Sequence, residues 1–109
     1  MAEQRKRVLI TGGAGFIGST LGAHLAAQGH LVSVMDDLSF GKRHLAPVPD
    51  ERFHHVDIRD RNAVMKAMQD IQPGWVLHLA AIHFIPYCNA HPIEATDINI
   101  SGTIHVLDA

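Results

Sequence analysis

The sequence predicts an α/β fold in which parallel strands alternate with helices. Short aliphatic or β-branched runs of strand length recur four times along the chain. Each run leads, directly or through a loop, to a segment whose apolar residues recur at helical spacing. A glycine-rich turn follows the first run immediately. Strands that alternate with helices in this way indicate a parallel sheet joined by crossover helices.

The first half of the chain predicts one strand–helix–strand unit. A strand is expected at residues 7–11, because a glycine-rich turn ends an uninterrupted apolar run there. A helix is expected at 16–28, with Gly29 as its stop. Its apolar residues recur at helical spacing, at Phe16, Ile17, Leu21 and Leu25. A second strand is expected at 31–35, and residues 38–51 are expected to form a loop with one short helical turn.

The second half predicts two further strands and two helices. The strands are expected at 52–56 and 75–79. Asp60 is a suitable N-cap for the helix between them, which is expected to end before Pro73. One face of that helix is expected to hold Val64, Met68 and Ile71. A long helix is expected from near Pro92 to the end of the chain.

Right-handed crossovers arrange these strands in the order 3-2-1-4, which makes the predicted fold a Rossmann-type parallel sheet flanked by helices. A doubly wound nucleotide-binding domain normally adds strands beyond the fourth. Residues 1–109 are therefore expected to be the N-terminal portion of such a domain, truncated after the fourth strand and its following helix. That helix is then expected to carry an unpartnered apolar face made of Ile98, Ile100, Ile104 and Leu107.

Composition excludes several classes of protein. Hydrophobic residues make up 47% of the 109 residues, enough for a buried core. Nine Lys and Arg against eleven Asp and Glu give a formal net charge of −2, which argues against a nucleic-acid binder. The single cysteine, Cys88, indicates a reducing compartment. No apolar run approaches the ~20 residues of a membrane span, so a cytoplasmic location away from membranes is expected.

The segment from Thr11 to Gly18 is the first motif with chemical content. It satisfies Gly-x-Gly-x-x-Gly through Gly13, Gly15 and Gly18, and a Thr-Gly-x-x-Gly-x-x-Gly variant that begins at Thr11 and Gly12. Such glycines permit a tight turn, close approach of a pyrophosphate and packing of helix on strand. The start of the helix then favours the diphosphate. The alternative is a glycine turn with a purely structural role.

Asp36 ends the second strand, eighteen residues after Gly18. A carboxylate there is placed to accept hydrogen bonds from the adenosine ribose hydroxyls of a dinucleotide. It would repel a 2′-phosphate, which favours NAD over NADP, although Lys42 and Arg43 lie close enough in sequence to soften that preference. The alternative is a solvated carboxylate at the end of a strand. Asp37 has the same chemistry, and strand alternation turns it toward solvent.

Five segments in one order and spacing resemble a known family. They are Thr-Gly-Gly-Ala-Gly-Phe-Ile-Gly at 11–18, Asp-Asp-Leu-Ser at 36–39, Asp-Ile-Arg-Asp at 57–60, His-Leu-Ala-Ala at 78–81 and Asn-Ile-Ser-Gly-Thr at 99–103. Together they resemble the NAD-dependent epimerase/dehydratase group of the extended short-chain dehydrogenase/reductase family, typified by UDP-glucose 4-epimerase. The resemblance covers the chain from residue 7 onward.

The resemblance implies a NAD site and a role for each matching position. Asp57 and Ile58 would flank the adenine ring, the small residues after the fourth strand would line the cofactor, and Asn99 would support the active-site region. The alternatives are a strand-ending carboxylate at Asp57 and a plain polar helix residue at Asn99. The implied cofactor-binding residues are Gly12, Gly15, Phe16, Ile17, Gly18, Asp36, Asp37, Ser39, Asp57, Ile58, Leu79, Ala80, Ala81, His83 and Asn99.

Two departures from the family pattern lie after the fourth strand. His83 stands where relatives often carry glutamine or lysine, and it could either donate to a cofactor phosphate or lie outside the site. Cys88 stands where serine is common. Relatives also use a Tyr-x-x-x-Lys pair for proton transfer, whereas the single tyrosine here, Tyr87, is followed by His91. No catalytic residue is therefore assigned, and no metal site is expected from the nine scattered histidines.

The first functional hypothesis is the NAD-binding part of a nucleotide-sugar epimerase or dehydratase. The resemblance implies that in the full-length relative a hydride moves between bound NAD and a sugar carbon. It also implies a nucleotide-sugar substrate in the full-length form and leaves room for a homodimer. The catalytic pair and a substrate domain are absent from these 109 residues, so the chain is not expected to be active alone. The second hypothesis is a non-catalytic module that binds a dinucleotide as a sensor.

Overall fold

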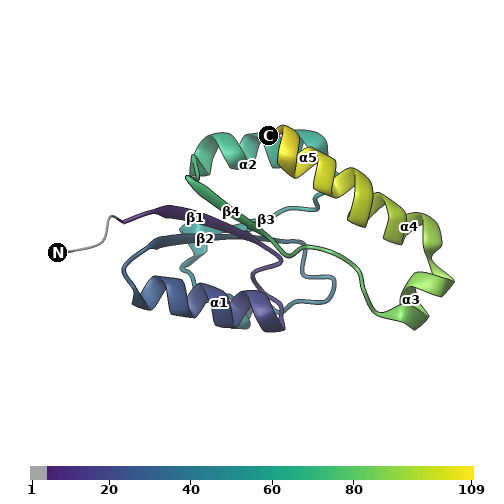
Figure 1. Ribbon diagram of the computed structural model, residues 1–109, viewed down its shortest axis with the longest axis horizontal. Helices are drawn as coiled ribbons and strands as arrows, with labels where there is room; N and C mark the ends of the chain where they lie inside the picture. Colours follow the sequence, from purple (N-terminus) through teal and green to yellow (C-terminus); the bar gives the residue numbers. More distant parts are fainter. Residues whose placement is uncertain (1–4) are drawn as a thin grey trace.

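A computed structural model describes residues 5–109 as a sheet between two layers of helices (Figure 1). The four strands are all parallel and lie in the order β3-β2-β1-β4, which confirms the predicted topology. Helix α1 covers one face of the sheet, and α2 and α5 cover the other (Figure 1). The strands and helices are β1 Arg7–Thr11, α1 Phe16–Ala27, β2 Leu31–Asp36, β3 Phe53–His55, α2 Arg61–Ile71, β4 Trp75–His78, α3 Ile85–Ala90, α4 Pro92–Thr96 and α5 Thr103–Asp108. None of the described helices is both long and apolar enough to cross a membrane.

Alternation along the two central strands divides the core between the two faces of the sheet. Val8 and Ile10 of β1 pack on the α1 side with Val32 and Val34 of β2. Leu9 of β1 points the other way and packs with Met35, Val64 and Met68 on the α2 side. All of the residues from 8 to 11 are fully buried, as expected for a central strand covered on both faces.

Helix α1 packs on the sheet differently from the sequence prediction. Phe16 and Ile17, placed on its apolar face by periodicity, are 88% and 67% exposed. The buried residues of α1 are Gly18 and Gly22 instead. An ideal Cβ on Gly22 would lie 3.0 Å from the Pro47 ring and 3.4 Å from Ile10 Cδ1. Leu21 and Leu25 of the predicted face are partly buried and pack on the core as expected. The two glycines let the helix approach closely, and only its first turn faces outward.

Helix α2 begins and packs as predicted. The Asp60 carboxylate accepts a hydrogen bond from Ala63 N at 3.1 Å, which caps the helix. Val64, Ala67 and Met68 are buried against the sheet, and the partly buried Ile71 packs beside them.

The C-terminal region is more irregular than the predicted single helix. A short helix, α3, precedes it, with a proline in the first turn where the missing N–H costs nothing. The main helix then runs through α4, a π-helical segment Asp97–Gly102 and α5. Ile98 was expected on the exposed face but is buried in the core, because it lies four and eight residues before the buried Gly102 and Val106 and so shares their side of the helix. The exposed apolar residues of this region include Ile100, Ile104 and Leu107.

Candidate functional site

A cavity of about 540 Å³ lies at the carboxyl ends of the strands, beside the glycine-rich turn. Ligands of open parallel sheets bind at this edge. The cavity collects every sequence-predicted candidate residue except Asn99, namely Gly12, Gly15, Phe16, Ile17, Gly18, Asp36, Asp37, Ser39, Asp57, Ile58, Leu79, Ala80, Ala81 and His83. Sequence reasoning missed the apolar part of the lining, which consists of Met35, Phe40, Val56, Ile82 and Ile98, and also missed Gly41.

Helix α1 opens into this cavity without a cap. Gly15 is its N-cap residue, no side chain accepts a hydrogen bond there, and the first turn holds no acidic residue. The first intrahelical bond runs from Ser19 N to Gly15 O at 3.0 Å. The N–H groups of Phe16, Ile17 and Gly18 precede that bond, and all three residues line the cavity. Free N–H groups and the positive end of the helix dipole make this end of the cavity suited to an anion.

Two glycines bring the glycine-rich turn, helix α1 and the loop after β4 into close contact. Gly12 has φ +74°, and a Cβ on it would lie 2.9 Å from both Ala80 N and Leu79 C. A Cβ on Gly18 would overlap the Gly12 carbonyl oxygen and lie 2.8 Å from Gly13 Cα. Only glycine fits at either position, because the neighbouring atoms belong to the backbone.

Asp36 holds the turn to the end of β2. Its Oδ2 accepts a hydrogen bond from Ala14 N at 3.0 Å, and its Oδ1 accepts one from Leu38 N at 2.8 Å. The residue is 8% exposed, and it still lines the cavity. A carboxylate offers about four lone-pair positions, so capacity remains for two hydroxyl donors of a ligand. The structure thus adds a structural role to the ligand-binding role predicted from sequence.

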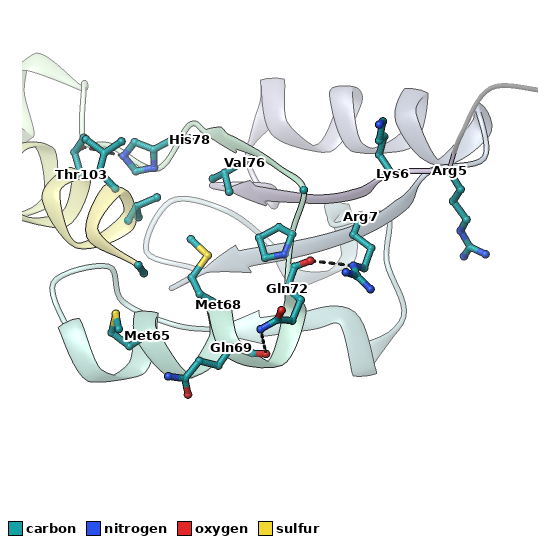
Figure 2. A pocket seen from close by; sticks show the side chains of 15 residues that line it. Arg5, Lys6, Arg7, Met65, Met68, Gln69, Gln72, Val76, His78 and Thr103 are labelled. Atoms are coloured by element: carbon teal, nitrogen blue, oxygen red, sulfur yellow. Dashed lines mark hydrogen bonds between the residues drawn. The ribbon is translucent and has the colours of Figure 1, made fainter.

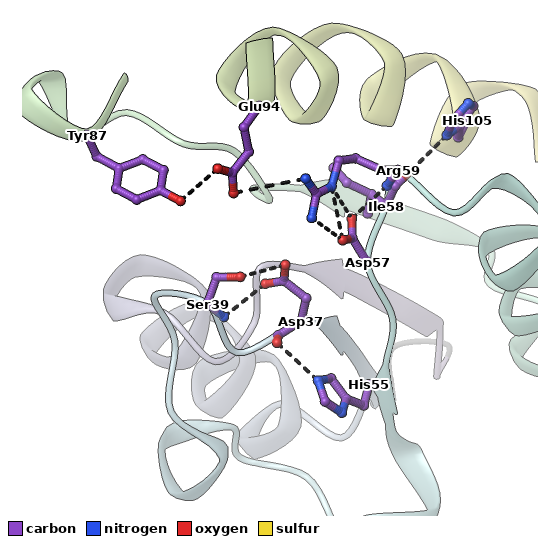
Figure 3. Close-up of polar contacts among 9 residues, drawn as sticks. All are labelled: Asp37, Ser39, His55, Asp57, Ile58, Arg59, Tyr87, Glu94 and His105. Carbon is purple, nitrogen blue, oxygen red and sulfur yellow. Dashed lines mark hydrogen bonds and ion pairs between the residues drawn. The ribbon is translucent and has the colours of Figure 1, made fainter. Parts of the chain in front are cut away.

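Asp37 is half-buried and lines the cavity instead of facing solvent as strand alternation predicted. Its two carboxylate oxygens accept hydrogen bonds from Ser39 N at 3.0 Å and Ser39 Oγ at 2.7 Å (Figure 3). This pairing shapes the loop after β2, because the strand ends at Asp36 and the alternation stops there.

A chain of polar contacts crosses from the end of β3 to the helices after β4 (Figure 3). Asp57 Oδ2 pairs with Arg59 Nη2 at 2.6 Å, and Arg59 also reaches Glu94 Oε1 at 4.0 Å. Tyr87 Oη donates to Glu94 Oε2 at 2.8 Å, and the Tyr87 ring meets Phe40 edge to face at 5.2 Å between centroids. The hydrogen bonds from Arg59 lower the pKa of Asp57, and the hydrogen bond to Glu94 raises the pKa of Tyr87. Sequence reasoning treated Asp57 alone and missed this network.

Replacing Arg59 with glutamine is expected to raise the pKa of Asp57 toward its ordinary value, because the guanidinium is the largest cause of the lowering. A depressed carboxylate pKa adds stability above the ordinary pKa, and that stability is lost as pH falls through the lowered value. The variant should therefore lose the Asp57 contribution to stability. Carboxyl NMR titration measures the shift, with Arg61→Gln, whose partner is Asp108, as the control. An unchanged Asp57 titration in Arg59→Gln would contradict the assignment.

Asn99 lies behind the cavity and not in its lining. Its Oδ1 accepts a hydrogen bond from Ile82 N and its Nδ2 donates to Ile82 O, both at 2.8 Å. The neighbouring Cys88 thiol also reaches Ile82 O at 3.5 Å. Because Ile82 lines the cavity, Asn99 fixes one wall of the cavity through the loop after β4.

A second, larger cavity of about 910 Å³ lies along the free edge of β4, between that edge and helices α2 and α5 (Figure 2). None of the candidate residues contributes to its described lining, and neither does the start of α1. Size alone therefore does not identify the candidate site. The smaller cavity is the candidate, because the start of α1 and the Asp36 carboxylate line it. Within residues 5–109, no group of three or more His, Cys, Asp or Glu side chains could hold a metal ion.

Comparison with known proteins agrees with this geometry. Residues 8–109 match the NAD dependent epimerase/dehydratase family. The chain belongs to that family. It is 37% identical over 103 residues to the UDP-glucose 4-epimerase of Lactobacillus helveticus, covering 94% of this chain and 31% of that protein. A Klebsiella pneumoniae UDP-glucose 4-epimerase is 32% identical, with 94% of this chain and 78% of that protein covered.

Solved structures of epimerase/dehydratase family proteins show the same fold. The crystal structure of the Thermus thermophilus UDP-glucose 4-epimerase in complex with NAD superposes with a TM-score of 0.86 at 38% identity. The match covers 93% of this chain and 32% of that one. The chain thus corresponds to the N-terminal NAD-binding region of the family and spans about a third of the length of that epimerase.

Proposed function

We propose that the chain binds NAD in the cavity beside the glycine-rich turn, as the NAD-binding part of a nucleotide-sugar epimerase or dehydratase. The observation that carries the proposal is that the uncapped start of α1 and the carboxylate of Asp36 line one cavity. The first suits a diphosphate and the second suits ribose hydroxyls, which are neighbouring groups in a dinucleotide.

The remaining residues of the cavity fit the other parts of NAD. Asp57 and Ile58 would hold the adenine, with the carboxylate as acceptor and the aliphatic side chain against the ring. Leu79, Ala80 and Ala81 would line the part of the cofactor beyond the pyrophosphate. His83, exposed at the cavity edge, would donate to a phosphate. The complex of the Thermus thermophilus epimerase with NAD supports this reading.

When bound, NAD would supply the hydride acceptor for a sugar carbon in the proposed full-length enzyme. The residues of this chain bind and orient the cofactor. A substrate domain, a nucleotide-sugar substrate, a homodimeric assembly and a cytoplasmic location belong to the same proposal.

Cofactor choice tests the role of Asp36. Asp36→Ala should weaken NAD binding by about tenfold or more, because a charge-assisted hydrogen bond contributes about 1.5–3 kcal/mol. NADP binding should change little or improve, because the carboxylate repels a 2′-phosphate. The substitution also removes the acceptor of two backbone N–H groups, a loss that affects both cofactors equally.

Isothermal titration of NAD and NADP, with Asp70→Ala measured beside it, therefore gives the ratio of the two affinities. Asp70 is exposed on α2, pairs with Lys66 and lies outside the cavity lining, so its loss should leave that ratio near the wild-type value. Equal losses of NAD and NADP affinity in Asp36→Ala would make Asp36 purely structural and remove the NAD assignment.

A non-catalytic dinucleotide-binding module is the second candidate function. It rests on the same cavity as the first, and residues 1–109 hold no Tyr-x-x-x-Lys pair, since Tyr87 is followed four residues later by His91. The 109-residue chain, loaded with NAD, is expected to show no turnover of UDP-glucose, because proton transfer assistance is typically worth about 10²–10⁴-fold. Measurable turnover would reject this second function and reveal a different acid–base group.

A further inference from the structure

His78, the last residue of β4, joins the glycine-rich turn to the C-terminal helix, and the proposed function assigns it no task. Its Nδ1 lies 2.6 Å from Thr11 Oγ1, and its Nε2 lies 3.0 Å from Thr103 Oγ1. Figure 2 shows the imidazole beside Thr103. The ring thus bridges two hydroxyl groups whose residues lie at opposite ends of the chain.

The hydrogen bonds around Thr11 determine where the protons lie. Thr11 Oγ1 accepts hydrogen bonds from Ala80 N at 3.2 Å and from Leu79 N at 3.0 Å, and Leu79 N also donates to the Thr11 carbonyl oxygen at 3.0 Å. A hydroxyl oxygen has two lone pairs, so both are used. In the hydrogen bond between Thr11 Oγ1 and His78 Nδ1, the Thr11 hydroxyl is therefore the donor and Nδ1 is the acceptor.

The other side of the ring gives the complementary answer. Thr103 Oγ1 donates to Asn99 O at 2.7 Å, which leaves its lone pairs for the N–H at His78 Nε2. The network is complete for one form of the ring alone, the neutral imidazole protonated on Nε2. A second proton on Nδ1 would face the filled lone pairs of Thr11 Oγ1. The hydroxyl oxygen would then have to give up either the hydrogen bond from Ala80 N or its share of the Leu79 N–H, which keeps the Thr11 carbonyl oxygen as an acceptor.

Those two hydrogen bonds, together with the one from Leu79 N to the Thr11 carbonyl oxygen, hold one wall of the cavity in place. Leu79 and Ala80 line the cavity, and their backbone lies so close to Gly12 that a Cβ there would meet it at 2.9 Å. Movement of this backbone would change the contact between the loop after β4 and the glycine-rich turn. The protonation state of His78 is thereby connected to the shape of the cavity.

The surroundings of His78 do not favour its charged form. Burial lowers the pKa of His78. His78 belongs to the lining of the larger cavity along β4. The other charged side chains of that lining are cationic, namely Arg5, Lys6 and Arg7. The C-terminal helix packs against His78 through Thr103, and its titratable side chains are engaged or turned elsewhere. Asp97 is exposed, Asp108 pairs with Arg61, and His105 lies within hydrogen-bond distance of the Ile58 carbonyl oxygen.

We infer that His78 is a positioning residue of the dinucleotide cavity, competent only as the neutral Nε2-protonated imidazole, and that its protonation weakens dinucleotide binding. The inference rests on the proposed NAD function. Affinity is expected to be constant above the pKa of His78 and to fall by up to about tenfold for each pH unit below it, because only the neutral fraction binds. His83 is the one histidine in the described lining of the cavity, and a parallel series in a His83→Gln background assigns the acid loss to His78.

The test is the dissociation constant of NAD for the full 109-residue chain between about pH 5 and pH 8. Wild type should lose affinity toward acid, whereas His78→Asn, whose amide oxygen can accept from Thr11 but cannot be protonated in this range, should show no such loss. His24→Gln, on the exposed side of α1, is the matched control and should keep the wild-type profile.

Nitrogen-15 chemical shifts of the wild-type imidazole provide a measurement that needs no variant. They should show the Nε2-protonated tautomer at neutral pH, and the Nδ1-protonated tautomer would overturn the inference. A flat wild-type profile, or an acid loss retained in His78→Asn, would overturn it as well. Absence of NAD binding at every pH would instead reject the proposed function on which the inference rests.

Discussion

Gly15→Val is expected to lower NAD affinity by about a hundredfold or more while the chain stays folded. Gly15 lines the cavity directly before the free N–H groups of the first turn of α1. Its backbone is extended, with φ −87° and ψ −175°, a conformation that valine also adopts. A Cβ there meets only the Gly12 carbonyl oxygen, at 3.4 Å, so the rest of the new side chain would occupy the cavity.

The expected magnitude follows from the bonds that the valine would exclude. Loss of two charge-assisted N–H contacts to a diphosphate, at about 1.5–3 kcal/mol each, exceeds about a hundredfold in affinity. Isothermal titration measures the loss, and circular dichroism with thermal melting verifies the fold. Gly74→Ala is the control, because a Cβ there lies 3.7 Å from its nearest neighbour, outside this cavity. Near wild-type affinity in a folded Gly15→Val would place the diphosphate elsewhere.

Gly18→Ala is expected to destabilise the fold itself by about 3 kcal/mol or more. Alanine is the better helix former by about 1 kcal/mol, so propensity alone would predict stabilisation. The added Cβ would overlap the Gly12 carbonyl oxygen and lie 2.8 Å from Gly13 Cα. These are backbone atoms of a tight turn, which cannot move without breaking the contact of Gly12 with Ala80. The steric cost therefore exceeds the gain in propensity.

Gly22→Ala provides the matched comparison, because it is the same substitution in the same helix. Its Cβ would meet the side chains of Pro47 and Ile10, at 3.0 and 3.4 Å, and a loop proline can shift by a few tenths of an ångström. Its stability should stay within about 1 kcal/mol of wild type. Thermal melting should show a fall of about 10 °C or more for Gly18→Ala alone. Equal melting temperatures for the two variants would contradict the packing argument.

The sequence by itself determined the strands, their order and most of the cavity lining. The apolar run around Leu9 is short and uninterrupted, which is the signature of a strand buried on both faces. Right-handed crossovers then left the order that the structure shows. Asp36 and the glycine-rich turn were predicted because both stand at the carboxyl end of a strand. In a parallel sheet all carboxyl ends lie at the same edge, so residues at these positions gather there. Asp60 was likewise a local signal, read and confirmed as a cap.

The tertiary structure alone decided the contacts that join distant side chains. Thr11 and His78 are 67 residues apart, and the bridge between them depends on the pairing of β1 with β4 and on ring orientation, neither of which periodicity encodes. The network of Asp57, Glu94 and Tyr87 arises because helices after β4 return over the end of β3. Phe16 and Ile17 face outward at the cavity, whereas Leu21 and Leu25 of the same predicted face pack on the core, and periodicity does not distinguish the two pairs. Local pattern fixes which elements form, and packing fixes which side chains meet.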